Sequence, residues 1–222
     1  MSTILTVIEV IGVVSFSVSG ALMAIDKEND FIGVIFLALI TSFGGGILRD
    51  IMIGNHPPVI FENFLLIAVS VVTATAVYFL AMIFKKYYIE NEETVQKINN
   101  YFDALGLGVF VISGAKLCMV AGIENPVLII VMGVISGTGG SMTRDIIMRE
   151  VPHLLRKHIY LLAAMAGATS YYLLFRIGLP DVASIIISAS IVVFIRICAT
   201  VFKWNMPKAI DFSKLRNEDN KN

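Results

Sequence analysis

Long apolar stretches alternate with short polar breaks along almost the whole 222-residue chain. A helix that crosses a bilayer needs about 20 mostly apolar residues. By that measure the sequence predicts seven membrane-spanning helices, at residues 4–25, 31–53, 61–84, 101–122, 126–148, 156–176 and 181–202. No segment alternates with a period of two over about ten residues, which disfavours a β-barrel. The pattern therefore indicates an all-α integral membrane protein in the lipid bilayer.

Composition supports this class and excludes several others. The chain is 57% apolar and 15% charged with a formal net charge of zero, whereas an ordinary soluble domain is about 25% charged. Because the chain has no excess of basic residues, we expect no nucleic-acid partner. Two cysteines are too few for a small domain held together by several disulfides. Motifs for nucleotide binding, zinc proteolysis and serine hydrolysis are missing, so we expect neither an enzyme nor a cofactor.

The basic residues are divided unequally between the two ends of the spans. Of the 17 lysines and arginines, twelve flank the side that holds the first loop and the C-terminus, one (Arg176) flanks the other side, and four lie within spans. Cytoplasmic loops carry the excess of Lys and Arg. We therefore expect a multi-pass protein of the cell (inner) membrane, with the N-terminus outside and a polar tail, 205–222, in the cytoplasm.

An internal repeat relates the first three spans to the next three. A motif built on Glu9, Gly12, Phe16 and Ser19-Gly20-Ala21 recurs 94 residues later, and a second string recurs after 95, as Gly44-Gly45-Gly46-x2-Arg49-Asp50 and Gly139-Gly140-Ser141-x2-Arg144-Asp145. Because three spans is an odd number, the second copy must enter the membrane from the opposite face. We predict one membrane domain, 1–204, that contains inverted repeats at 4–84 and 101–176 and a seventh helix at 181–203.

The two glycine runs are candidates for an ion pathway: Gly44, Gly45, Gly46 and Gly139, Gly140, Ser141. Consecutive glycines weaken a helix by about 1 kcal/mol each relative to alanine. If the helices unwind there, the freed carbonyls would need water or a cation, because lipid cannot satisfy them. The alternative is close packing of small residues between helices. Their matching depth in an inverted repeat favours the pathway.

Charged residues within the spans are the next candidates, because burying them in a membrane is unfavourable. We predict two repeat-related ion pairs, Glu9 with Arg49 and Asp103 with Arg144, either at pore mouths or as helix anchors. Adjacent residues on a helix point in different directions. The aspartates that follow the two arginines should therefore bond to loops or helix ends.

Lys116 differs from these charges because the predicted span places it near mid-depth, while its repeat counterpart is Leu22. In a cation pathway a buried ammonium group would act as a gate or a voltage-sensing charge. The alternative is a structural lysine that bonds to the carbonyl of a broken helix. Arg196, nearer the end of the seventh span, is expected to extend to the membrane surface.

The doubled glycine–arginine–aspartate string, the seven spans and the outside N-terminus resemble the trimeric intracellular cation (TRIC) channel family in its prokaryotic branch, also known as UPF0126 or the "glycine transporter" domain. This resemblance implies a homotrimer with one pore per subunit that passes monovalent cations, chiefly potassium, beside kinked second and fifth helices. It also places Lys116 on the helix whose basic residues are linked to gating. The second glycine run departs from the pattern at Ser141, and the Lys-Glu-Val triplet of animal members is missing.

The sequence leaves two candidate functions. The first is a passive, potassium-permeable cation channel with no bound metal beyond the permeant ion. The second is a secondary transporter of a small amino acid such as glycine, because transporters share the inverted-repeat architecture. A zwitterion site needs a carboxylate partner near mid-depth. The sequence shows only Lys116 there, which favours the channel.

Overall fold

The computed structural model describes residues 3–156, 159–202 and 204, which form helices joined by turns and loops, with no strand among them. In chain order the elements are α1 (Thr3–Asp26), α2 (Phe31–Met52), the 3-10 turn η1 (Val59–Glu62), α3 (Phe64–Ile83), α4 (Lys85–Glu90), α5 (Glu92–Val120), α6 (Pro126–Ile147), α7 (His153–Arg156), α8 (Ile159–Arg176) and α9 (Asp181–Val201).

The predicted all-α membrane fold with seven spans is confirmed. Six described helices are long and apolar enough to cross a bilayer: α1, α2, α3, α5, α6 and α9. The remaining span, the sixth in chain order, is α8, whose 18 described residues end at Arg176. It takes the place in the second repeat that α3 has in the first. Large apolar side chains stay exposed on these helices, including Phe64 and Val120. In a bilayer such side chains contact lipid, so their exposure is not unfavourable.

Element boundaries differ from the sequence prediction in two places. The charged segment 85–100 lies between the predicted third and fourth spans, so its sequence predicts a linker. In the structure it is helical and forms α4 and the first turns of α5. As a result α5 has 29 residues and begins at Glu92. The third span begins at Phe64 because residues 59–62 form a separate turn. The predicted polar tail at 205–222 lies outside the described residues.

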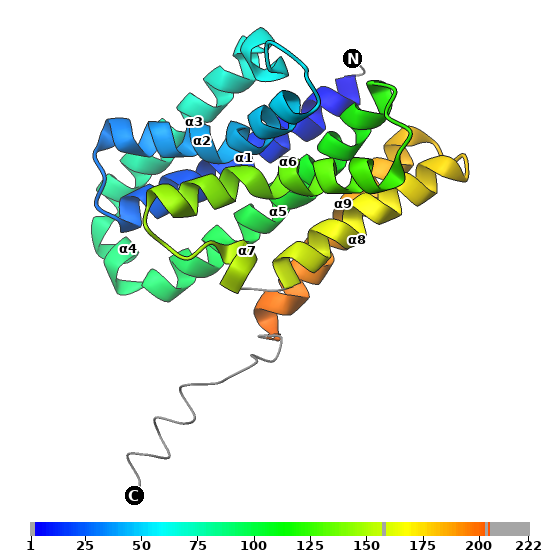
Figure 1. The fold of residues 1–222 in the computed structure, drawn as a ribbon. Coiled ribbons are helices and arrows are strands. Elements are labelled where there is room, and N and C mark those ends of the chain that lie inside the picture. Colours follow the sequence, from blue (N-terminus) through cyan, green and yellow to red (C-terminus); the bar gives the residue numbers. More distant parts are fainter. Residues whose placement is uncertain (1–2, 157–158, 203, 205–222) are drawn as a thin grey trace, which may run out of the picture.

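The two repeats pack in the same way within themselves and meet across a pseudo-two-fold axis. α1 packs on α2 and α3, just as α5 packs on α6 and α8, while α1 contacts α5 and α2 contacts α6. Figure 1 shows α1, α2, α5 and α6 in the middle of the bundle, with α3 on one side and α8 and α9 on the other. The repeat-related rings of Phe16 and Phe110 stack on each other, with centroids 5.3 Å apart. This contact lies where an axis between the repeats must pass.

The repeat also extends to the way its helices end. After α2, the amide of Asn55 donates to the carbonyl of Asp50 at 2.8 Å, and after α6 the amide of Glu150 donates to that of Asp145 at 2.9 Å. Both turns need a left-handed residue, which is Gly54 in the first repeat and Arg149 in the second. Equal turns place the charged end of each helix at equivalent positions on opposite faces.

Candidate ion pathway

The centre of the molecule is the crossing of α2 and α6, and the glycine runs allow it. A Cβ atom on Gly45 would lie 2.1 Å from the carbonyl oxygen of Ser136, and one on Gly140 would lie 2.1 Å from that of Thr41. These contacts are exchanged by the repeat, since each residue of one contact lies 95 positions from its equivalent in the other. Any side chain at either glycine would push the two backbones apart, so the crossing depends on glycine at both positions.

The expectation that the runs unwind their helices is wrong for the described structure. α2 is uninterrupted from Phe31 to Met52, and α6 from Pro126 to Ile147. Packing against the facing backbone explains why glycine is needed, which is the alternative weighed from the sequence. Gly46 differs from its neighbours, because the nearest atom to a Cβ there is Nη2 of Arg49 at 3.8 Å. Ser141 instead uses its hydroxyl, which lies 2.9 Å from the hydroxyl of Tyr160.

Each glycine run leads to a buried arginine that pairs with the aspartate next to it. Arg49 donates to Oδ1 of Asp50 at 2.9 Å and 2.8 Å, and Arg144 donates to Oδ1 of Asp145 at 2.9 Å from Nε and from Nη2. The expectation that these neighbours point apart is wrong, because the long arginine side chain folds back to reach the shorter one. Oδ2 of Asp50 accepts the amide of Val59, which begins η1, at 2.9 Å, and Oδ2 of Asp145 accepts the amide of His153, which begins α7, at 2.8 Å.

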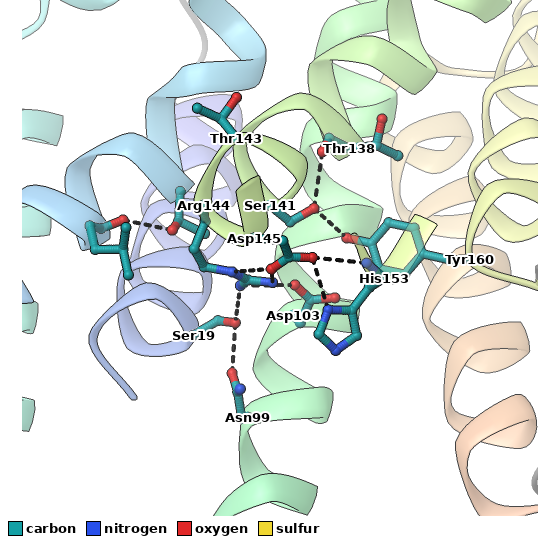
Figure 2. Close-up of polar contacts among 12 residues, drawn as sticks. Ser19, Asn99, Asp103, Thr138, Ser141, Thr143, Arg144, Asp145, His153 and Tyr160 are labelled. Atoms are coloured by element: carbon teal, nitrogen blue, oxygen red, sulfur yellow. Dashed lines mark hydrogen bonds and ion pairs between the residues drawn. The ribbon is translucent and has the colours of Figure 1, made fainter. Parts of the chain in front are cut away.

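In the second repeat the arginine joins a larger buried network (Figure 2). Nη1 of Arg144 lies 3.4 Å from Oδ1 of Asp103, so the predicted ion pair is present. The same Nη1 donates to the hydroxyl of Ser19 at 2.8 Å. Ser19 in turn donates to Oδ1 of Asn99 at 2.7 Å. Arg196 of α9 reaches the same carboxylate, with Nη2 3.6 Å from Oδ2 of Asp103. One carboxylate therefore lies between two arginines.

Arg196 does not extend to the membrane surface as expected. It is 1% exposed, and its guanidinium lies 4.3 Å from the centre of the Tyr160 ring. A cation over an aromatic face is stabilised by the ring's negative face. Because the seventh helix packs directly on α5 and α8, the side chain points into the bundle.

The first repeat lacks the matching pair. Among the described residues, Glu9 and Arg49 form no ion pair within 4.0 Å; Nη1 of Arg49 donates instead to the hydroxyl of Ser136 at 3.1 Å. The predicted symmetric partner is therefore replaced by a hydroxyl of the opposite repeat. Glu9 is half-buried on α1, and Arg49 and Lys116 are the cations that act on it electrostatically.

Two cavities open at opposite ends of the repeats. The first, of about 920 Å³, lies on the predicted cytoplasmic side between the ends of α1 and α3 and the start of α5, and the second, of about 810 Å³, lies between the ends of α5 and α8 and the start of α9. The repeat relates them, because Tyr78 lines the first and Tyr172, 94 positions later, lines the second. Asn99 and His153 line the first cavity and also bond to the Arg144 network.

The first cavity is rich in polar groups. Lys27 and Glu150 form an ion pair across it. The hydroxyl of Tyr88 donates to Oδ1 of Asp26 at 2.6 Å. Burial, and then this hydrogen bond, raise the pKa of Tyr88 well above its ordinary value, so the hydroxyl stays a hydrogen-bond donor even when the pH exceeds that ordinary value.

Lys116 lies nearer the end of its helix than the predicted span, 101–122, indicates. α5 starts at Glu92 and ends at Val120, which leaves Lys116 about one helical turn from the end of the helix. There it lines the second cavity and forms an ion pair with Asp181, the first residue of α9. The expectation that no acidic group is available to it is therefore wrong.

Solved structures and curated sequences resemble this chain over most of its length. A prokaryotic TRIC channel crystallised in 0.5 M KCl is 31% identical with a TM-score of 0.82, and it covers 93% of this chain and 100% of its own. The TRIC orthologue from Rhodobacter sphaeroides is 30% identical with a TM-score of 0.81, over 91% and 100% of the two chains. The UPF0126 membrane protein YvgT of Bacillus subtilis is 30% identical over 90% of this chain and 94% of its own.

A family model described as "Glycine transporter" matches twice, at residues 6–82 and 100–176. The chain belongs to the TRIC/UPF0126 family. The two matches of the TRIC/UPF0126 model coincide with the two structural repeats, so the repeat seen in the sequence is a property of the family. A UPF0126 membrane protein of Deinococcus radiodurans is 36% identical over 75% of this chain and 74% of its own.

Sequence reasoning missed several residues that this TRIC/UPF0126 fold brings to the buried charges. Asp181 starts the seventh helix, and an acidic residue in the first turn of a helix is ordinarily explained by its favourable interaction with the helix dipole. Tyr160 reads as an ordinary apolar position of a span. Asn99 lies in the segment expected to be a linker. The acidic position at the start of α9 was the one available signal, because it lies beside the predicted outer end of the span that carries Lys116.

Proposed function

We propose that the protein is a channel for monovalent cations, permeable to potassium, with an ion pathway through each subunit. The main support is the similarity to solved TRIC channels, which are 30–31% identical over more than 90% of the chain. The described geometry supports it, because two cavities open toward opposite faces and the α2–α6 crossing lies between the repeats that form them.

The pathway we propose runs from the first cavity past the Arg144 network to the crossing, and then past Arg49 to the second cavity. A bare guanidinium in a low-dielectric site would repel a passing cation strongly. Asp50 and Asp145 neutralise the two arginines at hydrogen-bond distance. The backbone of the runs Gly44, Gly45, Gly46 and Gly139, Gly140, Ser141 forms the narrow part, and the Asp103–Arg144 pair lies at its entrance.

Lys116 is the gating charge in this proposal. It lies on the wall of the second cavity with its side chain 21% exposed, where a change in membrane potential acts on it directly. Lys116→Ala should change the probability of opening and its voltage dependence while leaving the single-channel conductance near that of the wild type. Arg176→Gln removes a charge from the same cavity and should leave the voltage dependence unchanged.

We further propose that three chains assemble as a homotrimer in the cell (inner) membrane, with the N-terminus outside and the C-terminus in the cytoplasm. Support comes from the Rhodobacter sphaeroides relative, which is described as a trimeric intracellular cation channel. The YadS relative of Escherichia coli is described as an inner membrane protein. Native mass spectrometry of the purified protein should give three chains per particle, and a monomer would contradict this assembly.

A secondary transporter of a small amino acid such as glycine is the second candidate. The matching family model carries that description. In addition, Oδ2 of Asp103 and both Nε and Nη2 of Arg196 are buried without a hydrogen-bond partner among the described residues. Oδ2 of Asp103 and Nη2 of Arg196 pair with each other at 3.6 Å, and a zwitterion that entered between them would offer its ammonium group to the carboxylate and its carboxylate to the guanidinium.

Single-channel recording of the purified protein in a planar bilayer distinguishes the two. A channel gives discrete potassium currents far above the turnover of a transporter, and Lys116→Ala alters their opening. Saturable uptake of labelled glycine into proteoliposomes, without unitary currents, would establish the transporter and contradict the channel.

A further inference from the structure

The seventh helix lies outside both repeats, yet its first residue contacts the gating charge. Asp181 pairs through Oδ2 with Nζ of Lys116. Its other oxygen, Oδ1, accepts the hydroxyl of Tyr171 at 2.9 Å. The carboxylate therefore joins three helices, since Tyr171 belongs to α8 and Lys116 to α5.

Asp181 is held firmly in this position. Tyr171 is 1% exposed, so its hydroxyl cannot turn to solvent without unpacking α8. Asp181 is also the first helical residue after Pro180, and a carboxylate there is stabilised by the free amides and the dipole of the helix start. The flexible partner in the ion pair is the lysine, whose long side chain has several rotatable bonds.

The pair is a feature of one repeat only. Leu22, the repeat counterpart of Lys116, is 7% exposed and uncharged. The first repeat therefore has no charge at the equivalent position of α1, and the pair of Lys116 with Asp181 distinguishes the second cavity from the first. Because the two charges have opposite signs, a membrane potential pushes them in opposite directions and tends to separate or compress the pair.

We propose that Asp181 is the counter-charge that holds Lys116 against the seventh helix, and that breaking this ion pair is a step in gating. The inference rests on the proposed function, because it assumes that Lys116 gates a conductance. Breaking the pair would free the ammonium group of Lys116 to move within the second cavity, whose wall it forms.

The test compares variants of the protein by recording in planar bilayers over a range of voltages. Asp181→Asn keeps the shape and removes the charge. Asp181→Glu keeps the charge. Glu124→Gln is the control. Glu124 lines the same cavity, and its carboxylate forms no ion pair within 4.0 Å among the described residues.

We expect Asp181→Asn to shift the half-activation voltage and to change the open-to-closed ratio at a fixed voltage by about fivefold, the upper range for a partly exposed ion pair. Unitary conductance should be unchanged, and both Asp181→Glu and Glu124→Gln should stay near the wild type. Lys116→Met tests the pair from the other side, because adding Asp181→Asn to it should give no further shift.

The outcomes separate this inference from the proposed function. A wild type with unitary currents and an Asp181→Asn variant with the same voltage dependence would overturn the counter-charge alone. An additional shift when Asp181→Asn is combined with Lys116→Met would also overturn it, because the two residues would then act independently. A wild type without unitary currents overturns the proposed channel, and the gating role of Asp181 with it.

Discussion

Replacing Gly45 with alanine should destabilise the protein, whereas the same change at the next residue, Gly46, should not. The added Cβ at Gly45 would lie 2.1 Å from the carbonyl oxygen of Ser136, which belongs to the backbone of α6. A backbone atom cannot rotate away as a side chain can. The helices would have to separate by about 1 Å to restore ordinary contact, which begins near 3.4 Å.

The expected magnitude follows from two opposing effects. Overpacking a well-filled interior costs about 1–3 kcal/mol, and the rigid carbonyl places Gly45→Ala near the upper end. Alanine regains up to about 1 kcal/mol of helix propensity. The net loss of about 2 kcal/mol corresponds to a fall in Tm of about 4–8 °C for a chain of this size. At Gly46 the nearest atom is 3.8 Å away, so only the propensity gain applies and Tm should stay equal or rise.

The assay is thermal unfolding of the purified protein in detergent, followed by circular dichroism for both single variants and the wild type. Gly140→Ala, whose Cβ would meet the carbonyl oxygen of Thr41 at 2.1 Å, should behave like Gly45→Ala because the repeat makes the contacts equivalent. If Gly45→Ala and Gly46→Ala had the same Tm, the close crossing of α2 and α6 would not be what requires glycine. Equal effects at all three glycines of the run would instead favour local unwinding.

Two further variants test the buried charges and the first cavity. Asp145→Asn should lower the free energy of unfolding by about 3–5 kcal/mol, because it leaves Arg144 buried with less compensation; chemical denaturation in mixed micelles measures this, and a loss below about 1 kcal/mol would contradict the neutralising role. Tyr88→Phe should remove a pH dependence: the raised pKa of Tyr88 adds stability that is present below the ordinary value of 10.0 and is lost as the pH rises above it. The wild type should therefore lose Tm above about pH 10 more steeply than Tyr88→Phe, and parallel curves would refute this.

The spans and the repeat could be read from the sequence because both are local or periodic signals. Twenty consecutive apolar residues have few alternatives to a membrane helix. A shared string such as that of Arg49-Asp50 and Arg144-Asp145 needs no three-dimensional information to be recognised. Errors occurred at boundaries: the polar residues before Tyr101 read as a linker but are helical, and α5 ends at Val120, which places Lys116 about one turn from its end.

The partners of the buried charges could not be read in the same way. Symmetry and depth predicted both Asp103 with Arg144 and Glu9 with Arg49, and only the first pair is present. Nothing local to Arg49 indicates that Ser136, from the other repeat, will lie 3.1 Å from it. That contact depends on how closely α2 and α6 approach, which is set by the glycines that face Ser136 and Thr41 across the crossing.

The sequence by itself determined the fold class, the seven spans and the inverted repeat, because hydropathy and self-similarity are properties of the chain alone. The tertiary structure decided which carboxylate neutralises which cation, since several arrangements satisfy the same buried charges and differ only by small helix displacements. It joined Asp181 to Lys116 and Arg196 to Asp103 from a helix that the repeat does not include. Long-range pairings of this kind depend on packing, which no local pattern records.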